Sequence, residues 1–162
     1  MSPAVGGTGR VVGALATLTL VVGCSAAGAS GADDTGPDSV ETYETTLAPL
    51  KERSDVLEER FASVQGEGYT GPEQVREVLV EIIPEYAELL EETRDIEPRD
   101  DELAEAHEVL IASLERQQEG LELALRGMES DDSAALGDAA LALQEAQKLV
   151  LEHRSLLAEA RG

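Results

Sequence analysis

The sequence is poor in cysteine, aromatic residues and basic residues, and each shortage excludes a class of protein. It contains one cysteine among 162 residues, no tryptophan and only 2% aromatic residues. A single cysteine excludes an intrachain disulfide framework and any zinc site that needs several cysteines. The low aromatic content argues against a large pocket built from stacked rings. With 42% hydrophobic residues, mostly aliphatic, the chain can still bury a core.

Basic residues are scarce relative to acidic ones, 12 against 34, which gives a net charge of −22. Arg10 is the only charged side chain before Cys24, so the chain from Cys24 onward carries 11 basic and 34 acidic residues, a net charge of −23. Nucleic-acid binding needs a basic surface, and so does lying flat on an anionic membrane. We therefore expect no nucleic-acid partner. The charge favours solubility outside the cell, or the capture of cations or basic partners.

The sequence has no hydrophobic run long enough to span a membrane. Its longest run lies near the start of the chain. Residues 11–23 contain no charged side chain. A run of 13 residues is too short to cross a bilayer as a helix, which takes about 20 residues. It has the length of the apolar region of a secretory signal peptide. Small Gly23 directly precedes Cys24 at the end of this run.

The sequence Val21-Val22-Gly23-Cys24 resembles the lipobox of bacterial lipoproteins, with Val21 where leucine is more typical. The resemblance implies that residues 1–23 are a signal peptide cleaved between Gly23 and Cys24. It also implies that a diacylglyceryl group on the Cys24 sulfur anchors the protein to the extracytoplasmic face of the cell membrane. Two acyl chains are enough for stable anchoring. The alternative is a buried free cysteine in an uncleaved anchor helix.

Residues 24–37 are expected to form the lipidated cysteine and a flexible tether, because small residues, glycine and proline predominate and no periodicity is present. As a glycine-rich coil, this tether would span roughly 20 Å. Residues 38–162 are then one acidic helical domain of ordinary size.

The first helix of that domain is predicted from apolar residues that recur at intervals of three and four. It should start at Asp38 or Ser39, where Asp38 and Glu41 have capping-box spacing, and end at Gly66–Gly68. Pro49 predicts a kink or a short first piece that ends near Leu47. The predicted apolar face comprises Val40, Tyr43, Leu47, Leu50, Ser54, Leu57, Phe61 and Val64.

Three more helices are predicted in the same way. The second begins with a Thr70–Glu73 cap and should bend at Pro84. Its apolar face comprises Val75, Val78, Leu79, Ile82, Ile83, Tyr86, Leu89 and Leu90. The third begins between Pro98 and Asp101, and its face comprises Leu103, His107, Leu110, Leu114, Gln117, Leu121, Leu125 and Met128.

The fourth helix follows a polar turn at residues 129–132, which contains cap residues. Its face comprises Leu136, Leu143, Val150 and Leu157, with Ala139, Ala146, His153 and Ala160 between them. Four segments joined by short breaks predict an all-α, antiparallel up-down-up-down four-helix bundle. An extended helical hairpin that dimerises to complete its core is the competing architecture.

The two histidines, His107 and His153, lie on apolar faces and are equidistant from Ser130. If Ser130 is the centre of the turn, an antiparallel hairpin places both histidines at one level, near Tyr86 or Ala87 and Leu50 of the first two helices. They could bind a divalent metal ion or switch with pH. The alternative is a pair of half-buried histidines satisfied by neighbouring groups. Carboxylates that could assist a metal site are Glu105, Glu108 and Glu152.

No catalytic motif accompanies the histidines, because the sequence contains no glycine-rich phosphate loop, nucleophile elbow or His-Glu-x-x-His run. The Glu-x-x-His spacing of di-iron bundles is missing too, since Ala104 and Val150 stand at those positions. We expect neither an enzyme nor a cofactor.

Residues 70–160 resemble small helical lipoproteins of high-GC Gram-positive bacteria at Ile96-Glu97-Pro98, Ala106-His107 and Gly137-Asp138-Ala139-Ala140.

Two functions remain. The first is a membrane-anchored, non-enzymatic module that binds an envelope protein partner. The second is a lipoprotein that binds a small ligand or metal ion inside the bundle near His107 and His153. A module needs an apolar patch on its surface, whereas a ligand site needs a gap or convergent polar groups in the core. The expected patch comprises Leu141, Leu149, Leu151 and Leu156.

Overall fold

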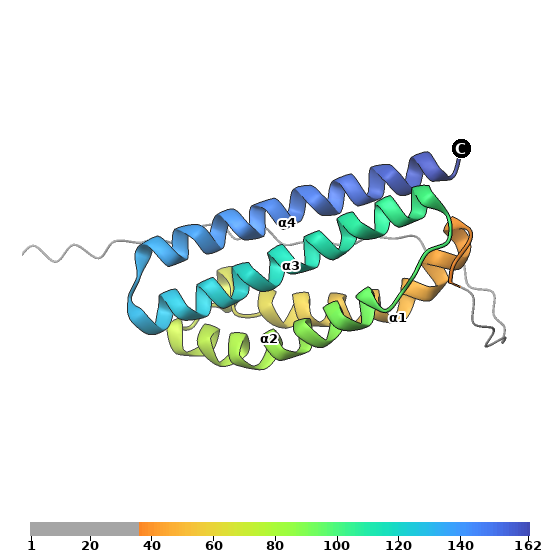
Figure 1. The fold of residues 1–162 in the computed structure, drawn as a ribbon. Helices are drawn as coiled ribbons and strands as arrows, with labels where there is room; N and C mark the ends of the chain where they lie inside the picture. Colours follow the sequence, from red (N-terminus) through yellow and green to blue (C-terminus); the bar gives the residue numbers. More distant parts are fainter. Residues whose placement is uncertain (1–35) are drawn as a thin grey trace, which may run out of the picture.

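The computed structural model describes residues 36–162, which form four α-helices and a short 3-10 turn (Figure 1). The helices are α1 (Val40–Ala62), α2 (Pro72–Arg94), α3 (Asp101–Ser130) and α4 (Ser133–Ala160), and the turn is η1 (Gly66–Gly68). Successive helices run antiparallel, and α3 lies between α4 and α2. The predicted all-α bundle is confirmed. The described part of a single chain supplies all four helices, so it does not form the extended hairpin.

The reversal between α3 and α4 is built by two consecutive aspartates. Asp131 ends α3 in the left-handed conformation with φ 52°, which turns the chain out of the helix. Asp132 is the N-cap of α4, and its carboxylate accepts hydrogen bonds from Ala134 N at 2.9 Å and Ala135 N at 3.3 Å. Asp100 caps α3 in the same way. These caps satisfy backbone N–H groups that have no partner inside a helix, which fixes where each helix begins.

The predicted start of α1 at Asp38 or Ser39 is confirmed at Ser39, whose hydroxyl accepts a hydrogen bond from Thr42 N at 3.3 Å, so the N-cap is not Asp38. The predicted start of α2 was partly wrong. The Thr70–Glu73 capping box does not form, because Gly71 occupies the N-cap position of α2 without a side-chain cap. The Thr70 backbone N–H donates instead to Gln74 Oε1 at 3.2 Å. Pro72 does lie in the first turn, where its missing N–H needs no partner.

Pro49 and Pro84 both lie inside continuous helices. The predicted short first piece ending near Leu47 was therefore wrong, because α1 runs without a break from Val40 to Ala62. Each proline removes one backbone hydrogen bond, and packing of the apolar face offsets that loss.

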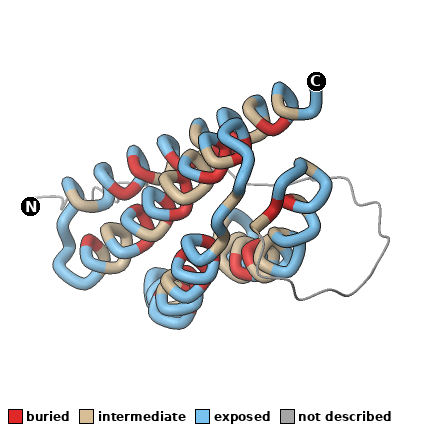
Figure 2. The backbone as a smooth tube through the Cα atoms, turned by 45° about the vertical axis from the view of Figure 1, so that its right-hand side comes forward, coloured by how far each residue is buried: buried red, intermediate tan, exposed pale blue. Residues whose placement is uncertain are grey.

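The core consists of two clusters on the facing sides of the helices (Figure 2). The larger one joins α1, α2 and α3 through Leu57, Leu79, Ile82, Tyr86, Leu89, Leu90, Leu114 and Leu121. The smaller one joins α1, α3 and α4 through Tyr43, Leu103, Ala106 and Leu157. Nearly all of these positions belong to the predicted apolar faces.

Helix α4 packs mainly against α3, and small residues allow the close approach. Ala139 and Ala146 are buried on α4, as their spacing predicts. On α3, a Cβ atom added at Gly120 would lie 2.7 Å from Leu143 Cγ, so only glycine fits there without displacing that leucine. Leu136 was wrongly assigned to the buried face. It is 41% exposed near the start of α4, although its side chain covers Gly127.

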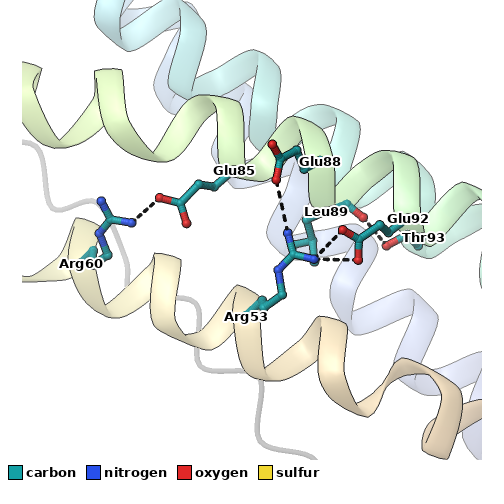
Figure 3. A network of polar contacts seen from close by, with 7 residues as sticks. All are labelled: Arg53, Arg60, Glu85, Glu88, Leu89, Glu92 and Thr93. Carbon is teal, nitrogen blue, oxygen red and sulfur yellow. Dashed lines mark hydrogen bonds and ion pairs between the residues drawn. The ribbon is translucent and has the colours of Figure 1, made fainter.

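Helix α1 is joined to α2 by a row of ion pairs (Figure 3). Arg53 Nη1 lies 2.6 Å from Glu92 Oε1, and Arg60 Nη1 lies 2.5 Å from Glu85 Oε1. Exposed pairs of this kind contribute little to stability, so they accompany the packing of the two helices rather than determine it. The side of α1 that faces α4 is different. There the space between the two helices is lined by apolar side chains and forms a cleft.

Candidate functional site

The two histidines lie inside the bundle around the ring of Tyr43. His107 of α3 and His153 of α4 are 4% and 6% exposed. Their ring centroids lie 5.7 Å and 6.3 Å from that of Tyr43, in edge-on and tilted arrangements. Both histidines thus occupy one level of the bundle, as the spacing around Ser130 predicts.

The predicted neighbours of this level were wrong by about two helical turns. The α1 residue at the level of the histidines is Tyr43 rather than Leu50. From α2, the end of the helix near Thr93 lies beside His107, rather than Tyr86. Tyr86 instead accepts a hydrogen bond from Gln117 Nε2 at 2.8 Å, farther along the bundle. The interhelical connections set this register, and helix periodicity alone does not determine it.

The two rings differ in their hydrogen bonds. His107 Nδ1 shares a hydrogen bond of 3.0 Å with Tyr43 Oη, while His107 Nε2 has no partner in good geometry. Neither ring nitrogen of His153 has a hydrogen-bond partner. A buried polar atom without a partner costs about 1 to 3 kcal/mol. His153 is therefore the least satisfied buried polar side chain of this cluster.

Burial keeps both rings neutral at physiological pH. Burial lowers the pKa of His107, although the nearby carbonyl groups of Thr93 and Ile96 and the carboxylate of Glu108 partly oppose the change. Burial lowers the pKa of His153 from 6.5 to about 4, and repulsion by His107, when that ring is protonated, and by Arg154 adds to the effect. A neutral imidazole presents one donor and one acceptor. His153 can thus offer both to a molecule beside it.

The metal site predicted for His107 and His153 lacks a third ligand. Within residues 36–162, no three His, Cys, Asp or Glu side chains are placed to hold a metal ion. Glu105, Glu108 and Glu152 are exposed on the outer faces of α3 and α4, whereas the imidazole rings point inward. Metal binding at these two histidines stays a prediction from the sequence.

A cleft of about 80 Å³ opens beside His153, between α1 and α4. α2 and α3 contribute its floor. Six leucines make its wall predominantly apolar, and they come from all four helices. These residues are Leu47 and Leu50 of α1, Leu89 of α2, Leu110 and Leu114 of α3, and Leu157 of α4.

The buried His153 ring in this cleft has no hydrogen-bond partner. The Ser54 hydroxyl has none in good geometry, although it lies beside the Glu58 carboxyl and the Tyr86 hydroxyl. Ser54 of α1 is 4% exposed. Thr93, which also lines the cleft, is satisfied because its hydroxyl donates to Leu89 O at 2.7 Å (Figure 3). The unsatisfied groups are therefore confined to Ser54 on α1 and His153 on α4, the two helices that border the opening.

The charged residues that line the cleft are Glu44 and Lys51, and both have ion-pair partners. Lys51 Nζ lies 2.7 Å from Asp55 Oδ2, and Glu44 pairs with Arg161 from the end of α4. The Glu44–Arg161 pair joins the two helices at one end of the cleft. No charge remains unpaired on the cleft wall for a ligand to neutralise.

Comparison of this chain with protein-family models, with characterised proteins and with solved structures gave no significant match. The geometry of the cleft therefore carries the functional interpretation. Gly23 and Cys24, the predicted cleavage and lipidation site, lie outside the described residues. Within residues 36–162, no helix has the length and apolar character needed to span a bilayer.

Glu58 of α1 is a notable residue that the sequence pattern did not single out. Its Oε1 atom is buried without a hydrogen-bond partner. Burial, together with the charge of Asp55, raises the pKa of Glu58 from 4.5 to about 7, although Lys51, Ser54 and Arg154 oppose the increase. Glu58 follows Ser54 by four residues and therefore shares its helix face. This four-residue spacing was the signal in the sequence that could have indicated a buried Glu58, but 34 acidic residues made it hard to recognise.

Proposed function

We propose that this protein is a lipid-anchored binding protein of the bacterial envelope, with Cys24 as its anchor and the cleft between α1 and α4 as its binding site for a small apolar molecule. One observation carries the proposal: an apolar cleft is lined by the buried His153 ring, which lacks any hydrogen-bond partner, and by the Ser54 hydroxyl, which has none in good geometry. Most binding pockets combine a largely apolar wall with a few such convergent polar groups.

The energetics of these two side chains support a binding role. In native proteins, nearly all buried polar groups are hydrogen-bonded, and exceptions concentrate where strain or function keeps them. A ligand that contacts His153 or Ser54 would satisfy polar atoms that cost stability in the free protein. Apolar contact with the surrounding leucines would add about 0.8 kcal/mol for each buried methylene group.

The same atoms favour binding over catalysis. Ser54 and His153 are the nucleophile and base types of a hydrolase, but they do not hydrogen-bond to each other. An activated serine needs that contact to its base, and the base needs a third group to orient it. The proposal is therefore a non-enzymatic one.

Benzene is a direct probe of the cleft, because small apolar cavities in proteins take up such molecules. In the full chain carrying Cys24→Ser, benzene should raise the melting temperature saturably and shift amide resonances on the facing sides of α1 and α4. Ala48→Phe, at the edge of the cleft, should weaken this binding at least tenfold. Ala140→Phe is the matched control, since Ala140 is an exposed residue of α4 outside the cleft. Equal binding to both variants would rule out the cleft as the site.

The anchor is tested separately in the native cell. Cys24→Ala should release the protein from the membrane fraction or leave it as an unprocessed precursor, because no acylated cysteine remains. Ser25→Ala, at the adjacent residue, should behave like the wild type. Membrane retention and mass unchanged by Cys24→Ala would eliminate lipidation at this residue.

A second candidate function, docking of an envelope protein partner, has support on the outer face of α4. Leu141 and Leu151 are 65% and 63% exposed, whereas Leu149 and Leu156 of the predicted patch are partly buried. A photo-crosslinking amino acid at Leu141 or Leu151 should capture one discrete partner in intact cells. The same label at exposed Val80 of α2 should not. Identical crosslinking patterns at all three positions would contradict docking through α4.

A further inference from the structure

We infer that the ligand of the cleft carries an uncharged head group that both donates and accepts hydrogen bonds, a hydroxyl or a primary amide, on a short aliphatic body. The inference rests on the proposed binding function and narrows it to a chemical class. It is drawn from the polar atoms inside the cleft, the pairing of the charges at its edge and the aliphatic nature of its wall.

The polar atoms of the cleft require a partner that can play both hydrogen-bonding roles. The neutral His153 ring has one N–H donor and one acceptor nitrogen, and the Ser54 hydroxyl can donate or accept. Both ring nitrogens of His153 are buried and unpaired, and the buried Ser54 hydroxyl has no partner in good geometry. A carboxylate would only accept and an ammonium would only donate, so each would leave part of this set unsatisfied. A hydroxyl or amide head can pair with whichever ring nitrogen faces it, the donor or the acceptor, and with the Ser54 hydroxyl.

The electrostatics of the cleft disfavour a charged head. The charges at its edge, Glu44 and Lys51, are already paired with Arg161 and Asp55. A charged head would therefore lose its hydration without gaining an unpaired counter-charge. An anion would also approach against the net charge of −22.

A cationic head would find no stable anion beside Ser54. The neighbouring carboxyl is that of Glu58, whose pKa is raised to about 7, so about half of it is protonated at neutral pH. Lys51 and Arg154 are the cations near that carboxyl, and they would repel an ammonium group. The uncharged head is thus favoured over both charged types.

The side chains that line the cleft determine the chemical type and size of the ligand body that fits it. Leucine side chains make up most of the wall, and the imidazole of His153 is the only ring among the residues that line it, so an aliphatic body fits the cleft by apolar contact. Each methylene that enters the cleft should raise the affinity about fourfold, from the usual transfer free energy of such a group. A cleft of about 80 Å³ restricts this gain to a few carbons, so the rest of a longer chain would project past Ala48 into solvent.

The test compares four probes with the same six-carbon body: 1-hexanol, hexanamide, hexanoate and hexylamine. Binding to the full chain carrying Cys24→Ser is measured at pH 7 by calorimetry, with benzene as a probe that has no polar group. The alcohol and the amide should bind at least tenfold more tightly than the acid and the amine. They should also shift the ring resonances of His153.

Replacement of the polar groups identifies their role. His153→Leu should weaken 1-hexanol binding about tenfold while benzene still binds, and Ser54→Ala provides a second variant should the first fail to fold. Gln144→Leu, at an exposed residue of α4, should change neither affinity. If benzene still binds, three results would overturn the inference alone. They are equal affinities for all four probes, tighter binding of a charged probe, and unchanged 1-hexanol binding in both polar variants. Binding of no probe, benzene included, would overturn the proposed function as well.

Discussion

Replacing His153 with leucine is expected to stabilise the protein, and to do so more strongly in acid. At pH 8 the variant removes two buried nitrogen atoms that lack partners, which should raise the free energy of unfolding by about 1 to 3 kcal/mol. At pH 4 the gain should be about 3 kcal/mol larger, because the wild-type ring resists protonation in the folded state. Chemical denaturation of both proteins across this pH range measures the difference.

The direction of this effect follows from proton binding. The pKa of His153 falls from 6.5 in the unfolded chain to about 4 in the folded protein, so the unfolded state binds more protons between these values. Above pH 6.5 the ring is neutral in both states and protonation has no effect on the free energy of unfolding. As the pH falls from 6.5 to about 4, protonation of the unfolded chain lowers the stability of the folded protein. Gln144→Leu, which adds leucine at an exposed position of the same helix, should show no such pH dependence. A constant effect of His153→Leu from pH 8 to pH 4 would contradict the buried, neutral ring.

Replacing Glu58 with glutamine is expected to have the opposite pH dependence. The pKa of this carboxyl rises from 4.5 in the unfolded chain to about 7 in the folded protein, mainly through burial. Its ionisation therefore destabilises the fold as the pH rises through this window. Glu58→Gln should add about 1 to 2 kcal/mol at pH 8, a value reduced by partial solvent screening, and almost nothing at pH 4.

The two groups titrate over overlapping ranges with opposite signs, so their effects largely cancel in the wild type. Between about pH 5 and pH 6, stability should rise with pH in Glu58→Gln and fall with pH in His153→Leu. Glu59→Gln serves as the matched control, because Glu59 is exposed on the same helix. Parallel stability profiles for the wild type and both variants would show that these side chains do not titrate abnormally.

Much of the fold follows directly from the sequence, because helix periodicity and capping are local properties. The spacing of Tyr43, Ser54 and Leu57 predicts the buried face of α1, and all three are buried. Asp132 caps α4 in the turn where cap residues were expected. The errors at Thr70 and Leu136 are also local. One arose from competition by Gln74 for a backbone N–H, and the other from the exposure of the first turns of α4, where Leu136 lies.

The candidate site was less predictable, because it depends on how far apart two helices lie. The spacing around Ser130 placed His107 and His153 at one level, since a tight hairpin fixes their relation. The register of Tyr43 against that level depends on two longer connections, and the assignment of Leu50 failed for that reason. The cleft itself arises because α4 packs against α3 and leaves a gap beside α1, a lateral displacement that no spacing in the sequence encodes.

A crystal structure of the full chain carrying Cys24→Ser, soaked with 6-bromo-1-hexanol, tests the central claim most directly. Anomalous scattering locates the bromine atom independently of any assumption about the ligand. We predict bromine density at the opening of the cleft between α1 and α4, beside Ala48, with the hydroxyl within hydrogen-bonding distance of His153 or Ser54. Bromine density confined to another surface, or an empty cleft at a saturating concentration, would contradict the account.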